Sequence, residues 1–151
     1  MTQAPFYASG LKFSCKRCSS CCRYSPGYVF LSKKDLGLLA KELKMDNTGF
    51  AKTYCRWVPQ PGSERLSLKE KSNFDCILWD QGCTVYNARP AQCRTFPFWK
   101  TVVASSLAWE TAAYGCPGIN SGKLHSSGAI IECIKLREKQ PPIEKQTARE
   151  I

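Results

Sequence analysis

The sequence predicts a small single domain of the α+β class, with short helices, a β-hairpin and long loops organised by metal. Short amphipathic stretches predict the helices, and two β-like runs around a glycine-containing turn predict the hairpin. Ten cysteines in 151 residues predict that bound ions hold the loops. We expect the domain to span residues 1–140 and a polar C-terminal tail to span residues 141–151.

The N-terminal part is expected to contain an irregular lead-in over residues 1–13 and a short strand over Tyr28–Leu31. Ser32 and Asp35 have the spacing of a capping box, and apolar residues at helical spacing follow them. These signals predict a helix over about residues 33–44.

A second helix is expected to begin after Asp46 or Asn47, with an apolar face that reaches Val58. The content of proline and glycine predicts a loop over residues 59–65. Cys55 lies beside the apolar face, where a cysteine is more often a small core residue than a metal ligand.

The hairpin is expected over residues 74–86, where two β-like runs flank Asp80-Gln-Gly82. Such a hairpin would bring Cys76 and Cys83 close together across the ladder, so that they could chelate one ion. The carboxylates of Asp75 and Asp80 are interpreted as solvated or helix-capping groups.

Three helices are expected in the C-terminal half. The first is short, begins at Pro90 and contains Cys93. The next is capped by Ser105 or Ser106. The last covers about residues 127–139 and contains Cys133, which we interpret as a core residue. The one histidine, His125, is interpreted as solvated or capping rather than as a ligand, and Glu110 as solvated or capping too.

Four thiols lie within eight residues at Cys15, Cys18, Cys21 and Cys22. A C-x2-C pair folds two sulfurs around one ion, and C-x2-C-x2-C is a run that holds three irons of a [4Fe-4S] cluster. Cys21 and Cys22 are neighbours whose side chains start in different directions, so one of them is expected to serve a second or a bridging centre.

The formal charge of +10 counts every cysteine as neutral. Two centres with four thiolates each would lower it to roughly +6, because each centre would carry a charge of about −2. Several lysine and arginine residues lie near the cysteines and can offset thiolate charge. We therefore interpret the positive charge as balancing metal-bound thiolates rather than as a nucleic-acid-binding surface, since no nucleic-acid fold signature accompanies the charge.

Four motifs together resemble the YkgJ-type cysteine-cluster family, also called the CxxCxxCC domain, which is described as zinc- or iron-chelating. They are Cys15-x2-Cys18-x2-Cys21-Cys22, Cys76-x6-Cys83, Arg89-Pro90-x2-Cys93 and Cys116-Pro117-Gly118. The resemblance covers about residues 13–120. It implies metal ligation by eight cysteines, namely Cys15, Cys18, Cys21, Cys22, Cys76, Cys83, Cys93 and Cys116.

The cysteine triple favours an iron–sulfur cluster, of the [4Fe-4S] type, over zinc, which stays the alternative. The eight thiols form either two sets of four or one cluster with accessory thiols. A metal or cluster carrier, or an electron-transfer module with a protein partner, is the first functional hypothesis. The alternatives are an accessory factor or enzyme of protein modification, from a more distant similarity to flagellin lysine methylases, and a nucleic-acid or protein adaptor with purely structural zinc.

No export signal, lipid anchor or membrane-spanning apolar run is evident in the sequence. Thiols in a cytoplasmic chain indicate metal or redox chemistry more often than structural disulfides. The expected location is therefore the cytoplasm.

Overall fold

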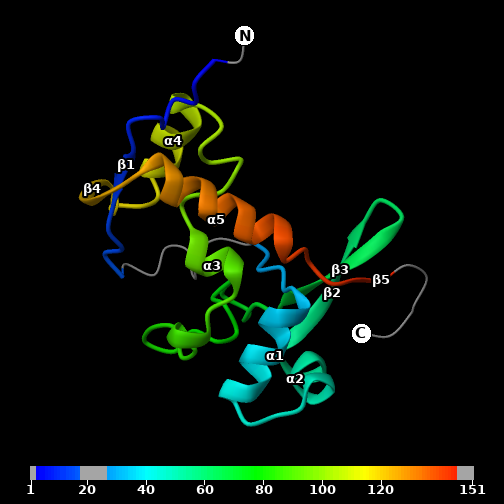
Figure 1. Cartoon of the computed structure of the whole chain (residues 1–151). Helices are drawn as coiled ribbons and strands as arrows, with labels where there is room; N and C mark the ends of the chain where they lie inside the picture. The colour runs from blue at the N-terminus through cyan, green and yellow to red at the C-terminus, as the bar shows by residue number, and fades with distance from the viewer. Residues whose placement is uncertain (1–2, 18–26, 146–151) are drawn as a thin grey trace. The chain divides into compact units, whose positions relative to one another are not determined.

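The computed structural model describes residues 3–17 and 27–145, and it divides into two compact units. Unit 1 comprises Met1–Cys21 and Thr95–Lys139, and unit 2 comprises Cys22–Arg94 and Gln140–Ile151. Within the described residues the elements are five α-helices, one 3₁₀ helix and two small antiparallel sheets, which confirms the predicted α+β class (Figure 1).

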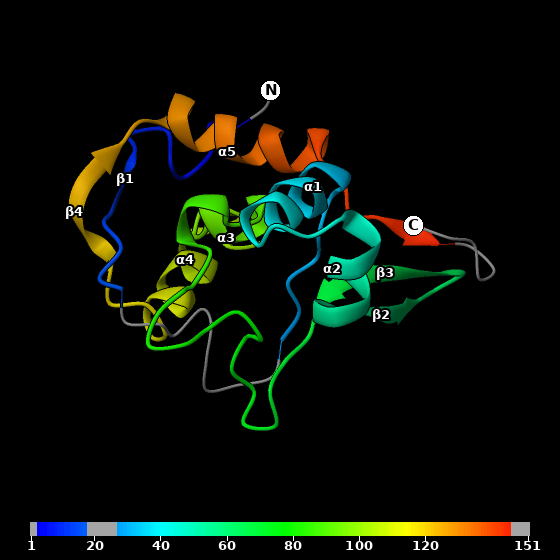
Figure 2. The ribbon, with the colours of Figure 1, turned by 90° about the horizontal axis from the view of Figure 1, so that it is seen from below.

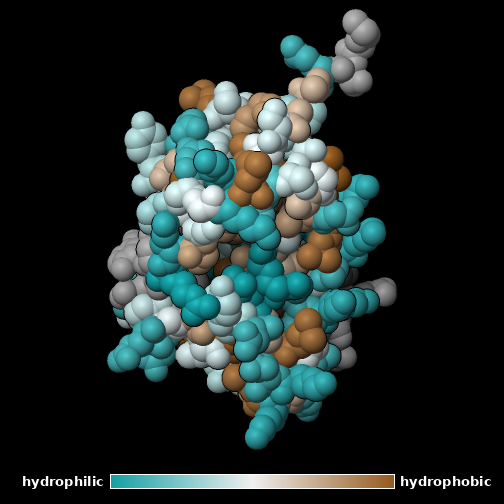
Figure 3. Space-filling view, turned by 60° about the vertical axis from the view of Figure 1, so that its left-hand side comes forward, coloured by the Kyte–Doolittle hydropathy of each residue, from teal (hydrophilic) through white to brown (hydrophobic). Residues whose placement is uncertain are grey.

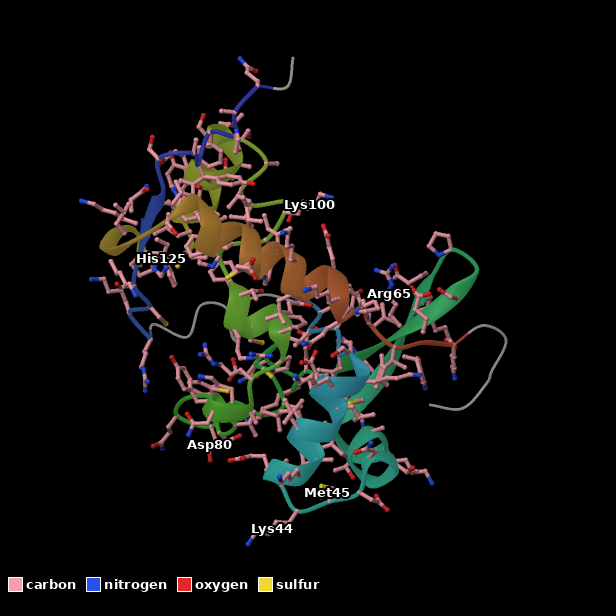
Figure 4. The ribbon with its side chains drawn as sticks, viewed as in Figure 1. Lys44, Met45, Arg65, Asp80, Lys100 and His125 are labelled. Carbon is pink, nitrogen blue, oxygen red and sulfur yellow. The ribbon has the colours of Figure 1, made fainter. Side chains whose placement is uncertain are left out.

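Unit 2 begins its regular structure with two helices, α1 (Lys33–Glu42) and α2 (Asn47–Tyr54). The predicted capping box is confirmed: Ser32 accepts the N–H of Asp35, and Asp35 accepts the N–H of Ser32. The two helices pack against each other, and the bend between them carries Lys44 and Met45 (Figure 4).

The prediction that the second helix reaches Val58 is wrong. The backbone becomes extended at Cys55, with φ −119° and ψ 160°, and Val58 lies in strand β2 (Cys55–Gln60). Pro59 gives the physical reason, because a residue that precedes proline is disfavoured in helical conformation.

The sheet of unit 2 contains β2, β3 (Ser63–Leu68) and β5 (Glu144–Lys145), in the order β2-β3-β5 (Figure 2). The hairpin is therefore β2–β3, and its turn contains Gly62 at φ +74°. The predicted strand over Tyr28–Leu31 is reduced to an isolated bridge between Phe30 and Ser67 of β3.

The hairpin predicted over residues 74–86 is wrong. Cys76 forms an isolated bridge with Glu70, and Cys83 forms one with Trp79, so the two cysteines do not face each other across a ladder. A tight turn joins Trp79 to Cys83, and within this turn the N–H of Asp80 donates to the carbonyl of Gly82. Both glycine-containing turns fit the pattern, but only the one at Gly62 is flanked by strands.

A buried apolar cluster holds unit 2 together, and Ile143 belongs to it although it lies in the segment predicted as a polar tail. The N–H of Ile143 donates to Leu31, and its carbonyl accepts the N–H of Leu66. The boundary at residue 140 stays a prediction, while residues 143–145 are packed onto β3. The other buried members are Leu31, Leu36, Leu39, Ala40, Phe50, Ala51, Cys55, Leu66, Leu68, Leu78 and Val85.

Unit 1 contains an antiparallel pair, β1 (Leu11–Phe13) and β4 (Ile119–His125), which lie side by side in Figures 1 and 2. Strand β1 corrects the prediction of an irregular lead-in, because three residues are too few to show an alternating pattern. The helices are α4 (Ser106–Ala113), capped by Ser105, and α5 (Ser127–Lys139), as predicted.

The core of unit 1 is smaller. Within the described residues it comprises five buried side chains, Phe98, Val103, Trp109, Ile119 and Ile130. The rings of Phe98 and Trp109 stack with centroids 5.9 Å apart, and the indole N–H of Trp109 donates to Asn120.

The described helices include none with the length and hydrophobicity needed to cross a lipid bilayer. On the face drawn in Figure 3, hydrophobic residues are interspersed with hydrophilic ones. Leu107 in α4 and Tyr114 at its end are exposed apolar side chains, and single exposed apolar residues are ordinary on protein surfaces.

Candidate metal centre

The predicted ligands that the structure describes lie in loops and in one short helix. In unit 1, Cys15 follows β1 and Cys116 lies between α4 and β4. In unit 2, Cys76 and Cys83 lie in the turn-rich segment between β3 and the 3₁₀ helix η1 (Tyr86–Ala88). Cys93 lies in α3 (Ala91–Thr95), while the predictions for Cys18, Cys21 and Cys22 concern residues outside the described part of the chain.

Cys15 is exposed, and its sulfur accepts the backbone N–H of Arg17 at 3.3 Å. Arg17 has φ +53°, which turns the chain back toward the sulfur. Hydrogen bonds from backbone N–H groups to ligand sulfurs are a feature of thiolate-bound metal centres, where they tune the properties of the metal. The loop geometry at Cys15 therefore fits a metal ligand.

The backbone on either side of the cysteines brings the segments of Cys15 and Cys116 together. The N–H of Ser14 donates to the carbonyl of Gly118 at 3.2 Å, and the hydroxyl of Ser14 accepts the N–H of Lys123 at 2.9 Å. The close approach requires glycine, because a Cβ at Gly118 or Gly122 would collide with Ser14.

Ser14, Gly118 and Gly122 were not singled out by the sequence reasoning. The sequence contains only a partial indication of their role, namely the Cys116-Pro117-Gly118 run, in which a glycine follows a candidate ligand. The pairing partner lies more than a hundred residues away in the sequence, so no local pattern predicts it.

The segment around Cys76 and Cys83 is held by backbone and side-chain bonds of its neighbours. The Lys71 ammonium donates to the carbonyl of Trp79 at 2.6 Å, and the Thr84 hydroxyl donates to that of Leu78 at 2.5 Å. Figure 4 shows Asp80 in this segment.

One of the carboxylates differs from its predicted surroundings. Asp75 is expected to be solvated or capping, but only 4 % of its surface is exposed, and its carboxylate accepts the side-chain N–H of Asn73 at 3.2 Å. This hydrogen bond offsets part of the cost of burying a polar group. Glu110 is exposed, as predicted, and its carboxylate accepts the side-chain amide of Asn120 in β4 at 3.1 and 3.2 Å.

The structure supports a core role for Cys55, as predicted. Its side chain belongs to the apolar cluster of unit 2, and burial raises the pKa of its thiol to about 12, against a small opposing effect of Lys69. Cys133 packs against the core of unit 1, and its pKa is raised by burial and by Glu132. A raised pKa disfavours the thiolate that a metal needs.

His125 is neither solvated nor a helix cap, which corrects the prediction. Its Nε2 lies 2.8 Å from the carbonyl oxygen of Phe13, and its ring contacts those of Phe13 and Phe98 (Figure 4). In the tautomer that carries the proton on Nε2, the imidazole donates to Phe13 and ties the end of β4 to β1. This is a structural role.

Across residues 3–17 and 27–145, no three His, Cys, Asp or Glu side chains form a group that could hold a metal ion. The described thiols alone therefore do not form a centre as they lie. A soft, thiolate-rich donor set is nevertheless the one that zinc and iron–sulfur clusters select.

A family model described as "Putative zinc- or iron-chelating domain" matches residues 14–117, about two thirds of the 151 residues. The matched range begins one residue before Cys15 and ends one residue after Cys116, so it encloses all eight predicted ligands and leaves Cys133 outside. No solved structure matches the chain. The chain belongs to the CxxCxxCC family of zinc- or iron-chelating domains.

Proposed function

We propose that the chain binds an iron–sulfur cluster, or zinc in its place, through the eight predicted cysteines and serves as a metal carrier or electron-transfer module. The observation that carries the proposal is the match of a chelating family over the range from Cys15 to Cys116. The N–H bond to the sulfur of Cys15 supports it, because backbone N–H bonds to ligand sulfurs are a feature of thiolate-bound metal centres.

We infer two centres of four thiolates each. Among the described candidates, Cys15 and Cys116 belong to unit 1, and Cys76, Cys83 and Cys93 belong to unit 2. Cys21 and Cys22 are adjacent in the sequence, and we propose that they serve different centres. The proposed sets are Cys15, Cys18, Cys21 and Cys116 for one centre and Cys22, Cys76, Cys83 and Cys93 for the other.

The cysteine triple favours iron over zinc, as argued from the sequence. The carrier and electron-transfer roles both need a protein acceptor, and a reducing compartment such as the cytoplasm keeps the thiols available. A reversible redox couple supports electron transfer, and release of metal to an acceptor supports a carrier.

Anaerobic purification, elemental analysis and an absorption spectrum test the proposal. Iron with sulfide and broad absorption at about 400 nm establishes the cluster, and colourless protein with about two zinc ions establishes the alternative. Cys116→Ser and Cys93→Ser each affect one set of four, so each is expected to remove about half of the metal. Protein that binds neither metal would refute the proposal.

A further inference from the structure

The short helix α3 is too small to hold Cys93 in place by itself. It spans five residues, and an isolated helix of this length is unstable in water because nucleation is costly. Its internal bonds include those from the N–H groups of Cys93 and Arg94 to the carbonyl of Pro90, both at 2.9 Å. Other contacts must therefore fix the position of Cys93.

The first of these contacts is the carboxylate of Asp35, which is 2 % exposed. One of its oxygens accepts the N–H of Ser32 at 3.0 Å and completes the capping box of α1. The other accepts the N–H of Ala91 at 3.0 Å, fifty-six residues away in the sequence. Ala91 is the first residue of α3, where N–H groups have no partner inside the helix. One buried carboxylate thus caps both helices.

The second contact is the side-chain amide of Gln92. Its oxygen accepts the N–H of Phe30 at 3.0 Å, and its nitrogen donates to the carbonyl of Tyr28 at 2.7 Å. The opposite edge of this segment pairs with β3, through the N–H of Leu31 and the carbonyl of Val29. The side chain of Gln92 therefore bonds to the outer edge of this extended segment, in the way that a neighbouring strand would.

We propose that Asp35 and Gln92 are positioning residues for the metal ligand Cys93, an inference that rests on Cys93 being a ligand in the proposed function. They fix the backbone of the two residues that precede Cys93, so the metal does not have to order this part of the chain. Partners that orient a ligand in this way typically change metal affinity by 10- to 100-fold.

The test is an anaerobic titration of the apo full-length chain with Co²⁺, in competition with a chelator. Thiolate-to-cobalt absorption counts the bound sulfurs, so it separates a lost ligand from a weakened one. Gln92→Ala removes the bonds to Phe30 and Tyr28 and leaves no cavity in the apolar core, to which Gln92 does not belong. Asp35→Asn leaves one oxygen, which cannot accept from both Ser32 and Ala91. Each is expected to weaken Co²⁺ binding by about 10- to 100-fold.

Two matched variants serve as controls for a purely structural effect. Ser32→Ala removes the side-chain cap of α1 but leaves the bond from Ala91 to Asp35. Asp46→Ala removes the cap of α2, where Asp46 accepts the N–H of Gly49 at 2.7 Å. Both should lower the melting temperature and keep the wild-type affinity for Co²⁺.

The outcomes separate this inference from the function on which it rests. If Cys93→Ser loses thiolate-to-cobalt absorption while Gln92→Ala binds as tightly as the wild type, Cys93 is a ligand and the positioning role is refuted. If Cys93→Ser keeps the wild-type affinity and spectrum, Cys93 is not a ligand and both ideas fail. Weakening by Ser32→Ala equal to that by Gln92→Ala would also refute the positioning role, since it would reflect general destabilisation.

Discussion

The thiol of Cys55 should make stability depend on pH in a way that a metal ligand would not. Its side chain is 6 % exposed, and burial raises its pKa from the ordinary 9.0 to about 12. The folded state thus keeps a proton that the unfolded chain releases above pH 9.0. The stabilising contribution is fully present below the unfolded pKa and is lost as pH rises through the folded pKa.

The size of the effect follows from the two pKa values. A difference of three pKa units corresponds to roughly 4 kcal/mol at the alkaline limit. At about pH 10 the unfolded thiol is about 90 % ionised and the folded thiol hardly at all, so roughly 1 kcal/mol should be lost. The same shift lowers the thiolate fraction at neutral pH by about 1,000-fold, so Cys55 should resist alkylation.

Urea unfolding at about pH 8 and about pH 10 measures this loss. The wild type should lose roughly 1 kcal/mol more than Cys55→Ala between the two conditions, because the lysines, tyrosines and other thiols titrate in both proteins. Val58→Ala is the matched control, since Val58 is equally buried on the same strand and has no titratable group. Cys55→Ala should also retain its metal.

An equal pH dependence of Cys55→Ala and the wild type would show that the folded state does not hold the proton. A loss of metal in Cys55→Ala would show that Cys55 is a ligand after all. Either result refutes the reasoning from burial.

The remaining predictions concern metal retention and backbone conformation. Cys83→Ser should give poorly soluble protein with reduced metal, whereas Cys133→Ser should keep its metal and melting temperature; elemental analysis and thermal unfolding decide. Gly37→Ala should raise the free energy of unfolding by about 0.5–1 kcal/mol, because Gly37 lies in α1 and an added Cβ meets nothing within 4 Å. Gly122→Ala should lower the free energy of unfolding by about 1–3 kcal/mol, because Gly122 has φ +79° and a Cβ would collide with Ser14. Urea unfolding measures both glycine variants, and changes of the opposite sign would contradict the two predictions.

Local signals predicted the helices well because their determinants lie within a few residues. The capping box of Ser32 and Asp35, the cap at Ser105 and the extent of α5 are all found where the sequence placed them. Helix caps depend on hydrogen bonds that span three residues, so the sequence pattern contains them completely. The failure at Val58 came from giving the apolar stripe more weight than the proline after it.

Pairings between distant segments could not be predicted in this way. Leu11 pairs with His125, Leu66 bonds to Ile143, and Asp35 bonds to Ala91. In none of these pairs does the sequence around one residue predict its distant partner. The candidate ligands were predictable as residues, since thiol spacing is a local property, but the groups that hold their backbones were not.

In both units, residues next to or near the candidate cysteines in the sequence make hydrogen bonds to distant parts of the same unit. Ser14 precedes Cys15 and bonds to Gly118, two residues after Cys116, while Ala91 and Gln92 precede Cys93. Such bonds fix where each Cα lies and leave the χ1 torsion of the cysteine to be set by the ion. Fixing the backbone before binding removes an entropic cost of about 1–2 kcal/mol per residue from chelation. A fold with small apolar cores can thus contribute to metal affinity through the hydrogen bonds that order the backbone beside each candidate ligand.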